Sequence, residues 1–366
     1  MGTTRTVSPL PPLDLAYKPD AAEAQQRMRA YWAGEMIDRP CVSIRGPRAG
    51  MVQPAYSQLA SPDYEFESAI ASYEEWAACT FFGGESMPSL HPWYGPDQWA
   101  GFVGATMKMM PELDTSWIEP CVDDWDNAGA LTIDSANHWW KGILELATLA
   151  ADKGEGKFLV STIDTHSNMD CLSAIRDPSR LCMDLIDNPA GVLRAVKQVD
   201  KLYEPVYDAV WTAGRMAARG STSWSDMYSE GRTQTVQCDF SYMVSPEHFK
   251  KLILPSLEYE ISCLDHAVYH LDGVGELPHV DDLLAIPNLH TIQWIPGAGQ
   301  PQAPEWLELL QKIQSAGKSV QVIVTPDELK AVCSELVPEK TFYWVLAGVG
   351  TEEEARELIA WMENHV

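Results

Sequence analysis

The stretch YHLDGVGELPH, residues 269–279, places two histidines, two acidic residues and two glycines directly after a short apolar run. Side chains alternate along a strand, so His270 and Asp272 would point to the same side. An imidazole and a carboxylate on one side could bind a borderline metal ion such as zinc. They could also transfer a proton, with the carboxylate orienting the ring. The alternative is a buried hydrogen bond that only satisfies the strand end.

A second pair has the same spacing, because Asp164 and His166 also follow an apolar run. The same two interpretations apply to this pair, and the catalytic interpretation gives both residues a role in proton transfer. Glu276 would join the site as a substrate or metal contact, or would cap the next helix together with His279. Cys238 is a candidate third metal ligand, or else a buried, inert thiol.

Aromatic and polar residues follow other apolar runs of the chain, which holds fourteen tryptophans. Indole faces suit apolar or quaternary-ammonium groups, although most aromatic side chains serve the core or its rim. We predict that Tyr228 takes part in catalysis. The residues that we predict to contact the substrate, besides Glu276, are His91, Trp93, Trp224, Asp226 and Trp294.

Short apolar runs alternate with helical patterns over most of the chain, which is typical of parallel strands joined by helices. The predicted strands cover residues 41–46, 85–90, 158–164, 221–226, 267–272, 291–296, 320–325 and 342–348. Eight such strands favour an α/β fold of the (β/α)₈ TIM barrel type with an elaborated N-terminal segment. In such a barrel the active site forms where the strands end. We expect a flexible arm over residues 1–20 and one barrel domain over residues 21–366.

The composition excludes several classes of function. A formal charge of −26 argues against nucleic-acid binding, which depends on clustered lysine and arginine. The eight cysteines form no CxxC pair, which suits a reducing compartment. The sequence shows no signal peptide and no apolar stretch of membrane-spanning length. We therefore expect a cytoplasmic protein without a nucleic-acid or membrane partner.

The order of three segments resembles that of the uroporphyrinogen decarboxylase superfamily, which includes cobalamin-dependent and thiol-directed methyltransferases. These segments read DNPAGVLRAVKQVDKLYEP, CDFSYMVSPEHFKKLILPSLE and AVYHLDGVGEL, and the resemblance extends over residues 25–360. It implies the same barrel fold. In the methyltransferases the corresponding strand ends in His-x-Cys-Gly and binds zinc. His270 matches that histidine, whereas Asp272 replaces the cysteine and no matching final cysteine is present.

The resemblance implies a metal-assisted enzyme that takes a methyl group from a small methylated substrate, with a corrinoid protein as the acceptor. Zinc would be bound by His270 and Asp272, with Cys238 or Glu276 as a further ligand. Family members are often dimers, so a homodimer is expected.

Two alternatives remain open at this stage. A metal-free decarboxylase of a polycarboxylate such as a porphyrinogen would use Asp164 or Asp272 to stabilise a protonated intermediate. Arg45 and Arg232 would then bind the substrate carboxylates. The other alternative is a barrel without catalytic activity that binds a small ligand.

Overall fold

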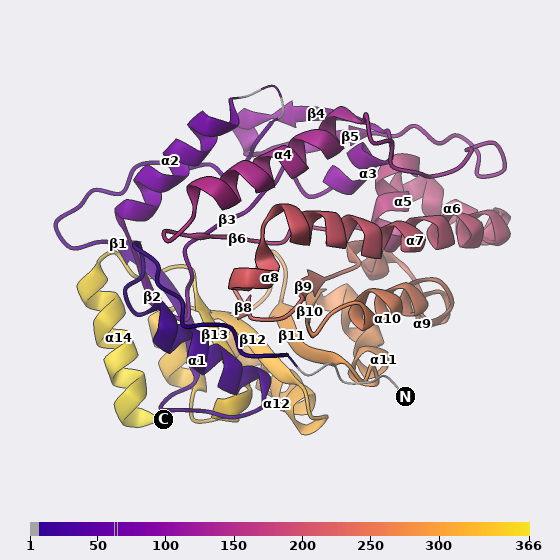
Figure 1. Ribbon diagram of the computed structural model, residues 1–366. Coiled ribbons are helices and arrows are strands. Elements are labelled where there is room, and N and C mark those ends of the chain that lie inside the picture. The colour runs from indigo at the N-terminus through magenta and orange to yellow at the C-terminus, as the bar shows by residue number, and fades with distance from the viewer. Residues whose placement is uncertain (1–6, 62, 64) are drawn as a thin grey trace.

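The computed structural model describes residues 7–61, 63 and 65–366 of the chain (Figure 1). Within these residues, seven strands form one curled sheet in the order β2-β1-β13-β12-β11-β10-β9. Its strands are β1 (Cys41–Pro47), β2 (Thr80–Gly84), β9 (Thr233–Val236), β10 (His266–Asp272), β11 (Leu289–Ile295), β12 (Ser319–Val324) and β13 (Thr341–Val345). All neighbours pair in parallel except β2, which is antiparallel to β1. The chain is thus a mixed α/β protein.

The ladder of this sheet does not close into the predicted eight-stranded barrel over the described residues. The remaining strands form separate pairs, which are β3 (Ser89–Leu90) with β6 (Leu159–Val160), β4 (Thr106–Met110) with β5 (Thr115–Glu119), and β7 (Ser221–Thr222) with β8 (Tyr228–Ser229). Pro88 shortens the predicted second strand because proline donates no backbone hydrogen bond. Two single hydrogen bonds, both 2.9 Å long, connect the segment after β6 to its neighbours. Ser161 N donates to Leu90 O of β3, and Thr162 N donates to Thr222 O of β7.

The predicted fourth strand, residues 221–226, is a second correction. Its strand structure ends at Thr222, and the place beside β10 belongs to β9, which the sequence analysis did not predict. The TQTV sequence of β9 is short and polar, although all four of its residues are buried. A strand with polar residues on both faces gives no alternating apolar signal.

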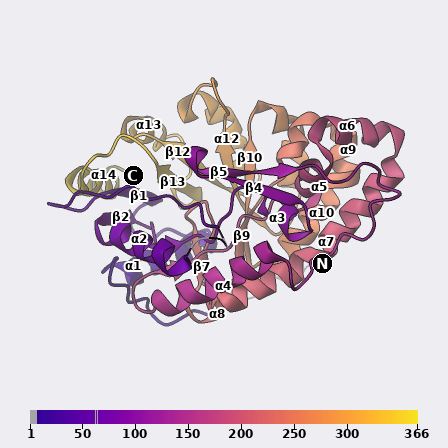
Figure 2. The same ribbon diagram turned by 90° about the horizontal axis from the view of Figure 1, so that it is seen from above.

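Helices surround the sheet; helix α4 crosses the upper part of the molecule in Figure 1, and the long helix α7 lies below it. Helix α14 lies at one end of the molecule and helices α5, α6 and α9 at the other, as both views show (Figures 1 and 2). The helices are α1 (Ala21–Trp32), α2 (Phe66–Ala78), α3 (Gln98–Phe102), α4 (His138–Lys153), α5 (Asn168–Arg176), α6 (Pro178–Asp187), α7 (Pro189–Ala213), α8 (Met216–Arg219), α9 (Pro246–His248), α10 (Leu254–Ser262), α11 (Val280–Leu284), α12 (Leu307–Ser315), α13 (Pro326–Val332) and α14 (Glu352–His365).

Strand β10 separates two apolar clusters. Tyr269 and Leu271 are fully buried in the large cluster that the outer helices share. Val268, on the opposite face, belongs to a smaller cluster that helix α1 covers. Alternation therefore turns Val268, His270 and Asp272 towards the inside of the curled sheet. Burial of each large apolar side chain contributes about 1.5–3 kcal/mol, so this orientation of the strand is strongly determined.

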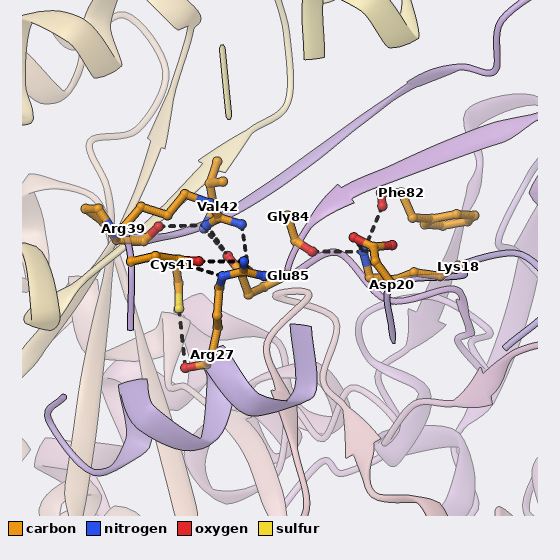
Figure 3. A network of polar contacts seen from close by, with 11 residues as sticks. Lys18, Asp20, Arg27, Arg39, Cys41, Val42, Phe82, Gly84 and Glu85 are labelled. Atoms are coloured by element: carbon orange, nitrogen blue, oxygen red, sulfur yellow. Dashed lines mark hydrogen bonds and ion pairs between the residues drawn. The ribbon is translucent and has the colours of Figure 1, made fainter. Parts of the chain in front are cut away.

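A polar network fixes the edge of the sheet where β1 begins (Figure 3). The buried carboxylate of Glu85 accepts two hydrogen bonds from Arg39, at 2.8 and 3.0 Å, and one from Val42 N at 2.7 Å. A buried ion pair is tolerated when such additional bonds satisfy its oxygens. Lys18 donates to the carbonyls of Phe82 and Gly84 at 2.9 and 2.8 Å. Of the arm predicted over residues 1–20, residues 1–6 lie outside the described residues.

Candidate active site

Three possible metal ligands converge at the C-terminal end of strand β10, which Asp272 closes. Asp239, His270 and Asp272 each offer a ligand atom, and these atoms all lie within 4.8 Å of one another. His270 Nε2 and Asp272 Oδ2 are 4.0 Å apart. The two carboxylates are partly exposed and the imidazole is nearly buried, so a small ligand or ion could reach all three.

Asp239, rather than Cys238, completes this cluster. Both residues follow β9, and adjacent side chains on an extended backbone point in different directions. The Cys238 thiol is fully buried, and burial, followed by the carboxylates of Asp170 and Glu276, raises its pKa well above the usual range. A cysteine binds a metal ion as its thiolate, which a raised pKa disfavours. The structure therefore gives Cys238 the environment of an inert core thiol.

The predicted pair Asp164 and His166 lies next to the cluster. His166 Nε2 is 3.7 Å from Asp164 Oδ2 and 4.0 Å from Asp239 Oδ2, and its Nδ1 is 3.3 Å from Asp97 Oδ1. Burial lowers the pKa of His166, but these three carboxylates outweigh it and raise that pKa well above its usual value. The carboxylates therefore favour the protonated form of His166. Burial raises the pKa of Asp164 to about 6.

His270 is held from two directions. Its Nδ1 lies 2.5 Å from Oε1 of Gln293, which occupies the paired position on β11. The ring of Trp224 meets the imidazole edge-on, with the ring centroids 4.9 Å apart. Trp224, which the sequence analysis assigned to the substrate pocket, therefore contacts the candidate metal ligand itself. These contacts leave Nε2 as the ring atom that faces the two carboxylates.

A cavity of about 380 Å³ adjoins the cluster. Asp239 and His166 belong to its wall, together with Asp97 and Asp170. Asp170 accepts hydrogen bonds from the backbone N–H groups of Asp239 and Phe240 at 3.0 and 2.8 Å, which fixes the loop after β9. Burial and the nearby Asp239 raise the pKa of Asp170 to about 7.

The charge of the cavity wall is one-sided. Among the described residues that line it, four are aspartates, one is His166 and none is lysine or arginine. The remaining lining is mainly apolar and includes Trp117, Phe240 and Met243. A partly apolar wall with a negative net charge favours a small ligand that carries a positive charge.

Asp226 was a predicted substrate contact, but its carboxylate is buried and bound by protein groups. It accepts hydrogen bonds from Ser43 and from Ser86, the latter 2.9 Å long, and pairs with Arg45 at 2.5 Å. Arg232 pairs with Asp208 at 2.5 Å and stacks on Tyr207. Both arginines that the decarboxylase alternative required therefore have internal partners.

Two predicted aromatic site residues lie elsewhere. Tyr228 belongs to the cluster under helix α1, and its hydroxyl donates to Arg219 O at 2.9 Å. Trp294 is buried in the outer core, where it packs on Trp306 with ring centroids 5.0 Å apart. Because Gln293 pairs with His270 and faces inwards, its neighbour Trp294 must face the helices.

The other predicted contacts lie outside the cluster of Asp239, His270 and Asp272. Glu276 is buried and accepts a hydrogen bond from Tyr269 OH at 3.0 Å. Burial, followed by Asp239, raises the pKa of Glu276 well above its usual value. His91 Nδ1 is 2.6 Å from Ser161 Oγ, and burial lowers its pKa to about 4. Trp93 is partly buried beside His91.

The sequence analysis missed Asp239, Asp97 and Gln293. Asp239 directly follows the cysteine that received the ligand assignment, and the missed strand β9 is what positions it. Gln293 is in register with His270, a relationship that no single sequence reveals without the strand pairing. Asp97 reaches His166 from the loop before α3, far from the predicted strand ends. It gave no recognisable signal.

Comparison with known protein families and with curated proteins gave no match. Among solved structures, the chain is similar to a methyltransferase from Methanosarcina mazei, with a TM-score of 0.61 and 13% sequence identity. The similarity covers 93% of this chain and 98% of the other. At this identity it shows a shared α/β fold. In the described part of the chain, none of the helices has both the length and the apolar character that a membrane crossing requires.

Proposed function

We propose that this chain is a metal-assisted, methyltransferase-like enzyme of the uroporphyrinogen decarboxylase superfamily. It removes a methyl group from a small methylated substrate bound in the cavity beside Asp239. The convergence of Asp239, His270 and Asp272, of which Asp239 also lines a ligand-sized cavity, carries the proposal. The fold, which is similar to that of a methyltransferase, supports the same class of reaction.

The three side chains fit a zinc ion by their chemistry. Zinc accepts one imidazole nitrogen and carboxylate oxygens at about 2.0–2.2 Å. Tetrahedral ligands at that distance lie about 3.4 Å apart, so ligand atoms now within 4.8 Å need to approach by at most about 1.4 Å. Two partly exposed carboxylates can move that far by side-chain rotation. When bound, the metal would supply a Lewis acid for a lone-pair oxygen elsewhere in the substrate, such as a hydroxyl, and would so orient the methyl donor.

The protein's own residues select the methyl donor. The net negative wall and the apolar faces of Trp117 and Phe240 favour a methyl group on a positively charged heteroatom, as in quaternary ammonium or sulfonium compounds. The methyl group leaves as CH₃⁺, and the heteroatom keeps the bonding electrons. A cationic donor therefore departs as a neutral amine or thioether and needs no proton from the enzyme.

We further propose that the acceptor is a corrinoid carried by a partner protein. Trp117 and Met243 stand at the cavity and are 65% and 50% exposed. Neighbouring Tyr242 is 51% exposed. Exposed apolar groups at the rim of a ligand site are typical of a docking surface. A corrinoid brought to this rim would face the substrate cavity.

The test begins with the metal content of the purified protein and with zinc titration of the chelator-treated protein. Methyl transfer to free cob(I)alamin is then measured with choline and with tetramethylammonium, with and without zinc. Binding of choline is compared with binding of its uncharged carbon analogue 3,3-dimethylbutan-1-ol. We expect zinc-dependent turnover of choline, whose hydroxyl oxygen can bind the metal, slower turnover of tetramethylammonium, and preference for the cation over its uncharged analogue. Turnover that survives chelation, or equal binding of both analogues, contradicts the metal or the substrate class respectively.

A further inference from the structure

Two buried glutamines connect His270 to a backbone carbonyl on the far side of the sheet interior. His270 on β10, Gln293 on β11 and Gln321 on β12 are paired in register, so their side chains lie at one level inside the curled sheet. Both glutamines are fully buried. His270 Nδ1 is 2.5 Å from Gln293 Oε1, Gln293 Nε2 is 2.6 Å from Gln321 Oε1, and Gln321 Nε2 is 2.7 Å from Ser225 O.

The donor and acceptor of each of these three hydrogen bonds follow from the last one, between Gln321 and the Ser225 carbonyl. The Ser225 carbonyl can only accept, so Gln321 must present its amide NH₂ there and its amide oxygen to Gln293. Gln293 must then donate to Gln321, which leaves its own oxygen towards His270. An oxygen cannot donate, so a neutral His270 must carry its hydrogen on Nδ1. The opposite tautomer would place two buried acceptors against each other.

The anchoring carbonyl is itself fixed. The hydroxyls of Ser223, Ser225 and Thr235 form a closed set of contacts of 2.7–2.9 Å, which ties the segment after β7 to strand β9. Asp226, the next residue, is held by Arg45 at 2.5 Å. The Ser225 carbonyl therefore has a defined position and direction, and the two amides take theirs from it.

We propose that Gln293 and Gln321 are positioning residues that hold His270 in the Nδ1–H tautomer. The lone pair on Nε2 then points to Asp239 and Asp272, ready to bind a metal ion or to accept a proton. The tautomer follows from the hydrogen-bond chain alone, whereas its use in binding a metal rests on the proposed function. A histidine ligand is commonly oriented by such a bond to its other ring nitrogen.

The test is the tautomer of His270 in the full-length, metal-free protein, read from long-range ¹H–¹⁵N correlation spectra of ¹⁵N-histidine-labelled samples. The spectra are recorded at a pH where the imidazole is neutral. Loss of one signal set in His270→Asn identifies the residue among the nine histidines. We expect the Nδ1–H pattern. An Nε2–H pattern for His270 in the unmodified protein overturns the proposal, and the variant His270→Asn is needed only to assign the signal.

The variant Gln321→Met keeps the side-chain volume and leaves Gln293 in contact with His270, but it removes the anchor. We expect a mixture of tautomers, because the Gln293 amide can then reverse. Gln234→Met is the matched control. Gln234 is also a buried strand glutamine, but it donates to Ile163 O and takes no part in the hydrogen bonds between His270 and Ser225. If the tautomer of His270 is unchanged in Gln321→Met as well as in the control, Gln321 does not determine it, and the proposal is contradicted.

Zinc affinity gives a second readout, measured by competition with a chelator. We expect Gln321→Met to bind zinc about tenfold more weakly than the control, as is usual for loss of a group that orients a metal ligand. If the unmodified protein binds no zinc, the metal-assisted function is contradicted. The tautomer of His270 still tests whether Gln293 and Gln321 position the ring. The two failures are thus distinguishable.

Discussion

A carboxylate oxygen of Asp239 lies 4.0 Å from Nε2 of His166. Asp239 also belongs to the cluster with His270 and Asp272, so this one residue joins the two histidine–aspartate pairs into a single site. One histidine of the site, His166, is surrounded by carboxylates that raise its pKa. The other donates from Nδ1 to an amide oxygen and presents a free lone pair.

Asp239→Asn should weaken zinc binding about tenfold or more, because it removes one of two anionic ligands while it keeps the shape of the side chain. Chelator competition measures the loss. Asp281→Asn is the control, since Asp281 is an 81% exposed carboxylate paired with Lys312 at the surface. Equal zinc affinity of the two variants would remove Asp239 from the candidate metal centre.

Arg45→Met should destabilise the fold by about 3 kcal/mol, because it leaves the buried Asp226 carboxylate without its charged partner. The double variant with Asp226→Asn should recover part of the loss. Urea unfolding of the single and double variants measures the coupling. A coupling free energy near zero between Arg45 and Asp226, together with altered binding of a polycarboxylate, would instead indicate that Arg45 binds the substrate, as the decarboxylase alternative requires.

Trp294→Ala and Trp224→Ala should have separable effects. Trp294 fills the core between β11 and the outer helices, so its loss should cost about 3–5 kcal/mol of unfolding free energy. Trp224 packs edge-on against His270, so its removal should weaken zinc binding more than it lowers stability. Unfolding curves and zinc titrations on both variants give the comparison. The reverse pattern would mean that Trp294 lines the site.

Glu260 on α10 should make stability depend on pH. It is buried, accepts hydrogen bonds from Ser167 at 2.6 Å and Asn168 at 3.2 Å, and burial raises its pKa to about 8. A raised pKa means that the folded state holds the proton more tightly. This contribution to stability is therefore full below the unfolded pKa of 4.5 and is lost as pH rises through about 8.

Glu260→Gln carries no titratable group, so it should gain stability relative to the unmodified protein between pH 5 and about 9. Thermal unfolding across this range measures the difference. Glu258→Gln on the same helix is exposed and serves as the control. A constant difference between Glu260→Gln and the unmodified protein at all pH values would show that the Glu260 carboxyl has an ordinary pKa.

The sequence was sufficient to locate the later half of the fold. The strands β10, β11, β12 and β13 were each predicted within a few residues, because each is a short, mainly apolar run followed by a helical pattern. The convergence of His270 and Asp272 was also predicted, since it depends only on alternation within one strand.

The rest of the site depends on relationships between strands. Strand β9 has no alternating pattern, and without it neither the position of Asp239 nor the burial of Cys238 can be inferred. Trp294 was assigned to the pocket from the sequence of its own strand. The register of β11 against β10, which turns Trp294 outwards, is set by packing between the strands and cannot be seen in that sequence. A shift of one residue would exchange Gln293 and Trp294 between the inner and outer faces.

The pairing of β1 with β13 sets Cys41 beside Phe342, roughly 300 residues further along the chain. During synthesis at about 5–20 residues per second, β1 leaves the ribosome on the order of 15–60 s before its parallel neighbour exists. Strand β2 covers one of its edges at once, while the other edge has open backbone groups throughout that interval. A nascent chain stopped before Thr341 would therefore present a ready template for pairing with another molecule, and a chaperone that shields this edge would be most valuable late in translation.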